Sequence, residues 1–230
     1  IYGIPGVGKS SFGAQAPSPI FLGSEEGTNN LDVTRLPPTP KWVDVEAAVN
    51  ELLTEKHDYK TLVVDSLDWL EPVLHQSICD KYNVKTIELA AGGYGKGYVE
   101  AVNEWIKFTK LISQLRDKRD MNVVFIAHAE IIKFSDPSNQ SDYDRYSLKL
   151  YKKSAAKFRE FVDSVLFANY DVLPKKDGTK TKAYGDDARY LFTSFKPGFE
   201  AKNRFGIPDK IPLSWDDYAR ETENDRSASP

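Results

Sequence analysis

Residues 3–10 read Gly3-Ile4-Pro5-Gly6-Val7-Gly8-Lys9-Ser10. They match the pattern G-x-x-x-x-G-K-[ST] of phosphate-binding loops at every defined position. Glycines at the first, fourth and sixth places allow backbone dihedrals that are closed to other residues, so successive N–H groups can point at one phosphate. A helix that begins beside Ser10 would aim its positive N-terminal end at the same anion. The stretch therefore predicts a nucleoside triphosphate site between a strand and a helix.

The last residues of the loop have distinct expected roles. We expect the Lys9 ammonium to contact the β- and γ-phosphates and the Ser10 hydroxyl to bind Mg²⁺. The predicted nucleotide-binding residues are Gly3, Pro5, Gly6, Val7, Gly8, Lys9, Ser10 and Ser11. The alternative is a glycine-rich turn that joins a strand to a helix without any ligand. Lysine and serine in register favour the phosphate site, with ATP and Mg²⁺ as cofactors.

The composition is that of one ordinary globular domain. The chain has 230 residues, of which 40% are hydrophobic and 28% are charged. Its formal net charge is -3 and its pI is about 5.7. Binding of nucleic acid therefore needs a local basic patch, or a groove built from several subunits.

Cysteine content and hydropathy indicate a cytoplasmic protein. Cys79 is the only cysteine of the sequence, so an intrachain disulfide is impossible, which fits a reducing compartment. No apolar run has membrane-spanning length and no signal peptide is visible, so we expect no membrane partner. Ile1 and Tyr2 read as the end of a strand, so we expect the true N-terminus to lie before residue 1.

Apolar strands and amphipathic helices alternate after the loop. Compact apolar runs predict strands at 19–22, 61–65 and 122–127. Apolar positions at helical spacing predict helices at 41–57, 70–82 and 99–119. Two more strands are expected at 165–172 and 189–195. The pattern predicts an α/β fold with a mostly parallel central sheet flanked by helices and a C-terminal antiparallel extension.

The C-terminal half has two polar features. Residues 145–159 contain six basic residues and no acid, and their apolar positions predict a helix. From about Arg220 the sequence is polar, and we expect a tail at 220–230 that is disordered or docked on a neighbouring molecule. No internal repeat or long linker is visible, so residues 1–219 are expected to form one domain.

Asp65 ends the apolar run Thr61-Leu62-Val63-Val64-Asp65. A carboxylate in this place is typical of the Walker B strand, which holds Mg²⁺ through water. A helix cap is the alternative, since Ser66 and Asp68 follow directly. The phosphate loop upstream favours the metal role.

Four motifs together resemble the RecA-like P-loop ATPases, most closely the short phage proteins that consist of little more than the ATPase core and act in single-strand annealing or recombination. The motifs are Val63-Val64-Asp65-Ser66, the loop Gly92–Tyr98, Phe125-Ile126-Ala127-His128 and Ala201-Lys202-Asn203-Arg204-Phe205-Gly206. The last one is also similar to the Lys-x-Arg element of DnaB-type hexameric helicases. The resemblance covers most of the chain and implies a RecA-like core.

The resemblance implies four further catalytic residues. Glu25, with Glu26 as a neighbouring competitor, matches the glutamate that activates the attacking water; both residues as solvated loop acids is the alternative. His128 occupies the strand-end sensor position, where an ordinary surface histidine is the alternative. Lys202 and Arg204 match fingers that reach the nucleotide of a neighbouring subunit, with a plain surface pair as the alternative.

Two segments that match the DNA-contacting loops of the RecA-like proteins combine basic and aromatic residues. The predicted single-stranded DNA contacts are Tyr94, Lys96, Tyr98, Lys133, Arg145, Tyr146, Lys149, Lys152 and Lys153. Tyrosine rings stack on bases of any sequence, and lysine and arginine neutralise phosphates. Charged helix faces exposed to solvent are the alternative.

The resemblance implies a Mg²⁺-dependent, DNA-dependent ATPase. We expect it to bind single-stranded DNA as a homo-oligomer, a filament or a ring, and to promote annealing or recombination. A single-strand binding protein is a further expected partner, in the cytoplasm of a bacterial host if the protein is phage-encoded. The alternatives are a hexameric helicase or its loader, a small-molecule kinase, and an assembly module that binds ATP without hydrolysing it.

Overall fold

The computed structural model describes residues 1–23, 30–135, 142–177 and 180–228. It divides the chain into two compact units. The first unit comprises Ile1–Gln15, His128–Leu148 and Asp163–Pro230, and the second comprises Ala16–Ala127 and Lys149–Val162. Each unit draws on stretches that lie far apart in the sequence. The single domain expected over residues 1–219 stays a prediction.

The first unit is built mainly from strands. Its strands are β1 (Tyr2–Gly3), β6 (Tyr143–Leu148), β7 (Ser164–Val165), β8 (Phe167–Asp177), β9 (Lys180–Phe192), β10 (Lys202–Asn203) and β11 (Lys210–Pro212). Its helices are α1 (Lys9–Ala14) and α6 (Trp215–Ala228). Strand β5 (Asn122–Phe134) belongs to the first unit from His128 onward and to the second unit before it.

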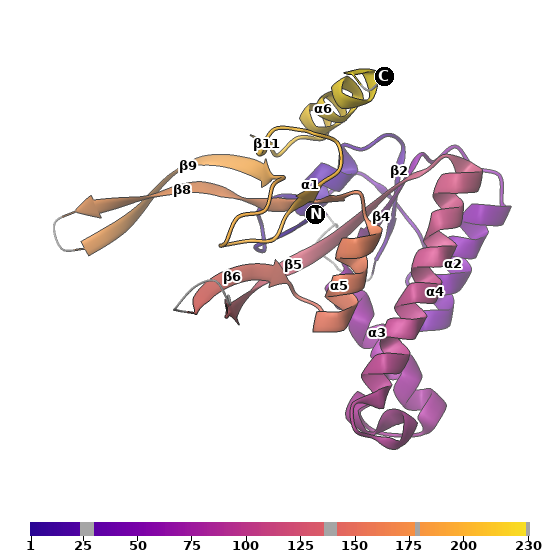
Figure 1. The fold of residues 1–230 in the computed structure, drawn as a ribbon. Coiled ribbons are helices and arrows are strands. Elements are labelled where there is room, and N and C mark those ends of the chain that lie inside the picture. The colour runs from indigo at the N-terminus through magenta and orange to yellow at the C-terminus, as the bar shows by residue number, and fades with distance from the viewer. Residues whose placement is uncertain (24–29, 136–141, 178–179, 229–230) are drawn as a thin grey trace. The chain divides into compact units, whose positions relative to one another are not determined.

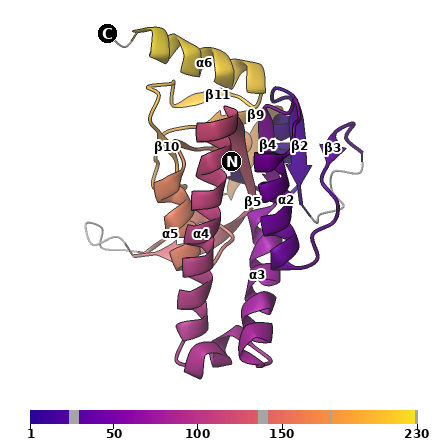
Figure 2. The same cartoon turned by 90° about the vertical axis from the view of Figure 1, so that its right-hand side faces the viewer.

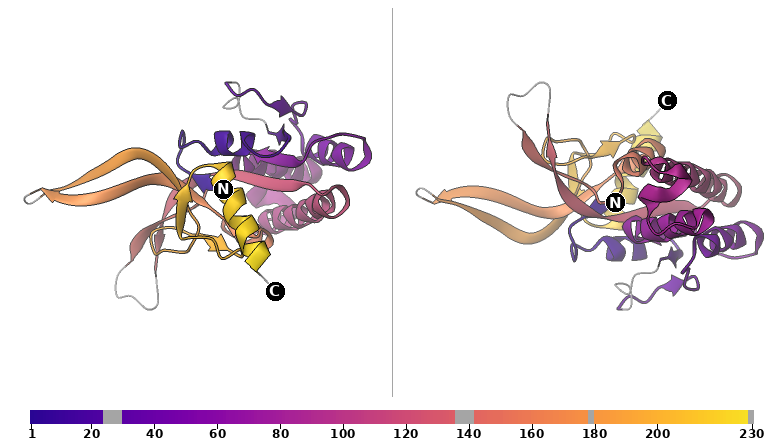
Figure 3. Two further views of the ribbon diagram at one scale, coloured as in Figure 1. Left: turned by 90° about the horizontal axis from the view of Figure 1, so that it is seen from above. Right: turned by 90° about the horizontal axis from the view of Figure 1, so that it is seen from below.

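Strand pairing in the first unit is mixed. Strand β1 pairs with β8 in parallel, while β8 pairs with β9, and β9 with β11, in antiparallel fashion. Figure 1 shows β8 and β9 as one long hairpin. The end of β5 forms a second hairpin with β6, over Ala129–Phe134 and Tyr143–Leu148, and Figure 3 shows the two hairpins as separate arms. The short strands β7 and β10 pair with each other.

The core of the first unit lies beneath the phosphate loop. Its buried residues are Val7, Phe12, Leu166, Ala168, Leu191 and Ile211. The ring of Trp215, at the start of α6, lies 5.3 Å from the ring of Phe12, and the backbone N–H of Trp215 donates to Gln15 Oε1 at 3.0 Å. This anchor explains why a polar sequence is helical. Helix α6 continues to Ala228, through most of the tail at 220–230 that was expected to be disordered or docked on a neighbouring molecule.

The second unit is an α/β layer structure. Its parallel strands are β2 (Pro19–Leu22), β3 (Thr34–Arg35), β4 (Thr61–Asp65) and the first part of β5, in the order β5-β4-β2-β3. Its helices are α2 (Trp42–Thr54), α3 (Leu67–Tyr82), the 3₁₀ helix η2 (Ile87–Gly92), α4 (Lys96–Arg119) and α5 (Lys152–Phe161). Figure 2 shows these helices side by side.

Aromatic rings fill the space between the helices and the sheet of the second unit. The Trp42 ring of α2 meets the Trp105 ring of α4 edge-on at 5.1 Å, and Trp105 meets Phe158 of α5 at 4.9 Å. All five residues of β4 are buried, as a strand covered on both faces requires. The predicted fold class is confirmed: parallel strands flanked by helices are followed by antiparallel strands toward the C-terminus.

Three expectations about local structure are wrong. Strand β5 does not end at His128 but runs to Phe134, because its last residues pair with β6. Residues 145–159 do not form one helix, since Tyr143–Leu148 is a strand and only α5 is helical. Helix α3 begins at Leu67, three residues before the expected start at Leu70.

Candidate functional site

The phosphate loop has the backbone that the motif predicts at two of its three glycines. Gly6 has φ 77 and Gly8 has φ 108, conformations that side chains disfavour. Gly3 instead lies in strand β1, where a Cβ would stand 2.2 Å from the Ala168 carbonyl oxygen. The first glycine is therefore required by the close approach of β8, not by its own dihedrals. The residues between them differ in burial: Val7 is fully buried, while Pro5 is exposed.

Lys9 lies under the loop, and its side chain is held by it. The residue is only 6% exposed, and its ammonium donates to the carbonyl oxygens of Gly3 at 3.1 Å and Ile4 at 2.9 Å. A buried ammonium needs such acceptors, because an unpaired buried charge is strongly unfavourable. Of the two serines that follow, Ser10 is half-buried and Ser11 is exposed. All eight predicted nucleotide-binding residues thus lie together in the first unit.

Arg189 is a cation beside the loop that the sequence analysis missed. Its guanidinium Nη1 donates to the Val7 carbonyl oxygen at 3.4 Å. A Cβ built on Gly8 would lie 2.9 Å from that nitrogen. Only the register of β9 against β8 brings Arg189 here, so no local sequence signal could have revealed it.

The predicted metal ligand Asp65 lies at the end of β4 in the second unit. The residue is 3% exposed, and β2 ends beside it. A Cβ on Gly23, directly after β2, would stand 1.9 Å from the Asp65 carbonyl oxygen. Gly23 therefore permits the two strand ends to approach closely, a role the sequence analysis did not assign. Glu25 and Glu26 lie outside the described residues.

His128 is half-buried and lies where β5 changes partners. Parallel pairing with β4 extends to Ile126, and antiparallel pairing with β6 begins at Ala129. The histidine therefore occupies a junction within a continuous strand rather than a strand end. Its role as a sensor of the nucleotide stays a prediction.

The predicted finger residues lie in and after β10 of the first unit. Lys202 is half-buried and pairs in register with Val165 of β7. Arg204 is exposed, and its Nη1 lies 2.7 Å from Asp163 Oδ1. Both side chains of this ion pair are about half exposed, so it contributes only about 0–1 kcal/mol.

Predicted DNA contacts in the second unit differ in how available they are. Tyr94 is 100% exposed and has φ 54, and it lies between Gly93 and Gly95, which also have positive φ. Lys96 is exposed at the start of α4. Three further exposed lysines lie before or at the start of α5, namely Lys149, Lys152 and Lys153. These five side chains are accessible to a nucleic acid.

Tyr98 is half-buried, and its side chain is engaged by other residues of the second unit. Its ring stacks on the Tyr151 ring at 4.5 Å, with an interplanar angle of 21°, and its hydroxyl donates to Glu88 Oε1 at 2.5 Å. This hydrogen bond, and then burial, raise the pKa of Tyr98 to about 12. Glu71 of α3 accepts the Tyr151 N–H at 2.8 Å. The cluster ties the start of α4 and the start of α5 to α3, so the two predicted DNA segments share one support.

Predicted DNA contacts in the first unit are mostly engaged by the fold. Arg145 is 5% exposed, with its guanidinium carbon 3.6 Å from the Phe134 ring centroid. It donates from Nε to the Pro197 carbonyl oxygen and from Nη2 to the Tyr143 hydroxyl. The ring of Tyr146 packs on another ring at 5.0 Å. Lys133 is exposed on β5. Arg145 therefore stabilises the β5–β6 hairpin. Its contact with a DNA phosphate stays a prediction.

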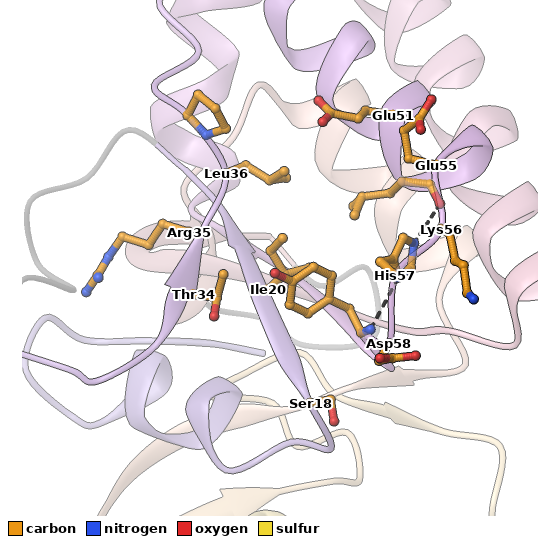
Figure 4. Close-up of a pocket in the computed structure, with 13 residues that line it drawn as sticks. Ser18, Ile20, Thr34, Arg35, Leu36, Glu51, Glu55, Lys56, His57 and Asp58 are labelled. Carbon is orange, nitrogen blue, oxygen red and sulfur yellow. Dashed lines mark hydrogen bonds between the residues drawn. The ribbon is translucent and has the colours of Figure 1, made fainter.

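A pocket of about 670 Å³ lies in the second unit between β3 and the segment after α2 (Figure 4). The ring of His57 accepts the Tyr59 N–H through Nδ1 at 3.2 Å and donates from Nε2 to the Leu52 carbonyl oxygen at 2.8 Å. Arg35 and Lys56 line it together with acidic residues. No predicted site residue lines this pocket, so we do not place the nucleotide there.

Ser10 and Asp65 carry oxygen ligands of the kind that Mg²⁺ prefers. A serine hydroxyl and a carboxylate are hard oxygen donors, and Mg²⁺ in nucleotide sites is held by one or two such groups together with water and phosphate oxygens. Asp65 is a nearly buried carboxylate at a strand end, so a positive partner would stabilise its charge.

No helix among the described residues has the length and apolar character needed to span a bilayer.

Two comparisons with known proteins bear on this site. The family model described as an AAA domain matches residues 1–205, which include the phosphate loop and the segment with Lys202 and Arg204. The chain is also 29% identical, over 134 residues, to YorG, an SPbeta prophage-derived uncharacterized protein of Bacillus subtilis (strain 168). That match covers 56% of this chain and 40% of the relative, so the chain spans less than half of the relative's length. From the family match, this chain belongs to the AAA domain family of P-loop ATPases.

Proposed function

We propose that this protein is a Mg²⁺-dependent ATPase that acts on single-stranded DNA as an oligomer. The observation that carries the proposal is the phosphate loop, in which Gly6 and Gly8 take left-handed conformations and Lys9 is fixed beneath them. Such a loop presents backbone N–H groups and one ammonium to a phosphate. Membership of the AAA domain family supports nucleotide binding and hydrolysis.

Hydrolysis would need a bound metal ion and a base that activates water. Ser10 and Asp65 would hold Mg²⁺, which when bound neutralises charge on the phosphates. Glu25, or its neighbour Glu26, would accept the proton of the water that attacks the γ-phosphorus. The close approach of Gly23 to the Asp65 carbonyl oxygen supports this role, because the end of β2, the last described position before Glu25, lies beside the end of β4.

Lys202 and Arg204 are proposed to act on the nucleotide of a neighbouring subunit. Cations in this role neutralise charge that develops during phosphoryl transfer, and an arginine finger is worth about 10³–10⁵ in turnover. The ion pair with Asp163 holds Arg204 only weakly, which supports its release to a phosphate. The isolated subunit would then hydrolyse ATP slowly.

Single-stranded DNA is proposed to bind the second unit across the starts of α4 and α5. The exposed ring of Tyr94 would stack on a base, and the four lysines that accompany it would contact phosphates. The stack of Tyr98 on Tyr151 supports a common surface, because it joins the two segments that carry these residues. In the first unit, Lys133 is an additional candidate contact.

The activity on DNA is proposed to be annealing or recombination. The SPbeta prophage origin of the relative YorG supports a phage-associated protein, in which such activities and a single-strand binding protein as partner are expected. A hexameric helicase or loader is the second candidate, favoured by the sequence Lys202-Asn203-Arg204. Electron microscopy of the protein with ATP and DNA separates closed rings from filaments.

The experiment that tests the proposed function is the ATPase rate with and without single-stranded DNA, measured at low and high salt. We expect stimulation by DNA that decreases as salt rises, because phosphate contacts release counterions. The variant Lys9→Ala should abolish nucleotide binding and serves as the inactive control. Absence of both stimulation and salt-sensitive DNA binding would refute the DNA-dependent role.

A further inference from the structure

Arg189 comes next to the phosphate loop through the register of three strands of the first unit. Strand β1 ends at Gly3, which pairs with Ala168 of β8. Strand β8 continues past that point, and Tyr170 pairs with Arg189 of β9. The register therefore places Arg189 beside the segment that follows β1, and that segment is the phosphate loop. Its carbonyl oxygen accepts the Leu213 N–H at 2.9 Å, which fixes the backbone at this position.

The guanidinium of Arg189 touches the loop without being buried by it. Its Nη1 lies 3.4 Å from the Val7 carbonyl oxygen, a long distance for a hydrogen bond, and the residue is exposed. A neutral carbonyl occupies one of the five N–H donors of a guanidinium. The planar group therefore retains the capacity to hold an anion that enters the loop.

Gly8 keeps the space between the loop and this guanidinium open. A Cβ there would come within 2.9 Å of Arg189 Nη1 and 3.3 Å of Leu213 Cδ2, in addition to the strain at φ 108. The loop and Arg189 thus lie close together where the loop has a residue without a side chain. Any phosphate that the loop N–H groups bind lies within the field of a second cation besides Lys9, and that second cation comes from the same chain.

We propose that Arg189 is a nucleotide-binding residue that contacts the phosphate groups of the triphosphate in the same subunit. The proposal rests on the proposed function, since it assigns a further residue to the same site. Lys9 is held by loop carbonyls, whereas Arg189 approaches from β9, so the two cations meet the ligand from different elements. Binding is then completed within one subunit, and hydrolysis awaits the cations of its neighbour.

The test is the dissociation constant of a fluorescent N-methylanthraniloyl ATP for the full chain and its variants at two salt concentrations. We expect Arg189→Gln to weaken binding by about 10- to 100-fold, the worth of one charge-assisted hydrogen-bond pair. Arg189→Lys should recover part of the loss, because it keeps the charge but not the fork. The affinity of Arg189→Gln should also depend less on salt.

Arg220→Gln is the matched control, because Arg220 is an exposed arginine of the same unit that pairs with Asp217 on α6. Thermal unfolding without nucleotide checks that each variant folds. The proposal is overturned if Arg189→Gln and Arg220→Gln bind as wild type does while Lys9→Ala loses binding. If the wild-type chain itself does not bind the probe, the proposed function fails and this assignment fails with it.

Discussion

Gly23 shows how one residue without a side chain positions a catalytic candidate. The Asp65 carbonyl oxygen lies where the Cβ of any other residue would be, at 1.9 Å. A side chain at position 23 would force β2 and β4 apart at the end that carries Asp65, the proposed metal ligand. From the sequence, such a glycine is interpreted as an ordinary loop residue, because the residues around it do not reveal which backbone segment passes close to it.

We predict that Gly23→Ala lowers the free energy of unfolding by about 1–3 kcal/mol, because the extra methyl group overpacks a backbone contact. Denaturant unfolding measures the change. Gly198→Ala is the matched control, since no atom lies within 4 Å of the Cβ that it adds. Equal stabilities of the two variants would contradict the steric role of Gly23.

Tyr94 and Tyr98 were indistinguishable in the sequence, yet they have opposite environments. Tyr94 is fully exposed, and Tyr98 is stacked and hydrogen-bonded. We predict that Tyr94→Ala weakens single-stranded DNA binding by about 1–3 kcal/mol through loss of base stacking. Fluorescence anisotropy with a labelled oligonucleotide measures this. Tyr98→Phe, which keeps the ring, should bind DNA as wild type does; a larger loss for Tyr98→Phe than for Tyr94→Ala would reverse the assignment.

At the scale of elements, helix α3 links the Walker B strand to the predicted DNA surface. It begins two residues after Asp65, and its Glu71 accepts the N–H of Tyr151. One turn further along α3, the ring of His75 meets the Tyr98 ring edge-on at 5.6 Å. Among the described residues, His75 Nε2 and Glu71 Oε1 are buried without a hydrogen-bond partner. The junction of α3, α4 and α5 is therefore polar and sensitive to charge.

Burial lowers the pKa of His75, and the nearby carboxylates of Glu71 and Glu88 offset this only in part. A histidine whose pKa is lower in the folded than in the unfolded state binds fewer protons when folded, so its contribution to stability is complete above about pH 6.5 and is lost as pH falls. We predict that wild type loses more stability than His75→Gln on acidification through this range. Thermal unfolding as a function of pH tests it, and parallel profiles would contradict the burial of a neutral His75.

The sequence predicted elements well where one local pattern suffices. The phosphate loop, β2, β4 and the helices α2 and α4 follow from a motif, a compact apolar run or a helical period. The β5–β6 hairpin was missed because the residues of a strand do not reveal which other strand it pairs with. For the same reason Arg189 went unnoticed: a single arginine gives no sequence signal of its position, and only the fold places this one beside the loop. The fold also places Arg145 against the rings of Phe134 and Tyr143, and its contact with DNA stays a prediction.

At the scale of the whole molecule, the proposed hydrolysis requires two subunits for one active nucleotide site. The phosphate loop would belong to one subunit, and Lys202 and Arg204 to its neighbour. A contact of this kind joins two different surfaces, so it generates rings or filaments. Removing the loop lysine and removing the finger arginine should therefore impair the two opposite sides of the same subunit interface.

Mixing two inactive variants tests this claim most directly. Lys9→Ala removes the loop cation but keeps Arg204, whereas Arg204→Ala keeps the loop and removes the finger. In an equal mixture, we predict that roughly a quarter of interfaces pair an intact loop with an intact finger, so the ATPase rate recovers to roughly a quarter of the wild-type rate. A mixture no more active than either variant alone, although both variants assemble with wild-type chains, would contradict a nucleotide site shared between subunits.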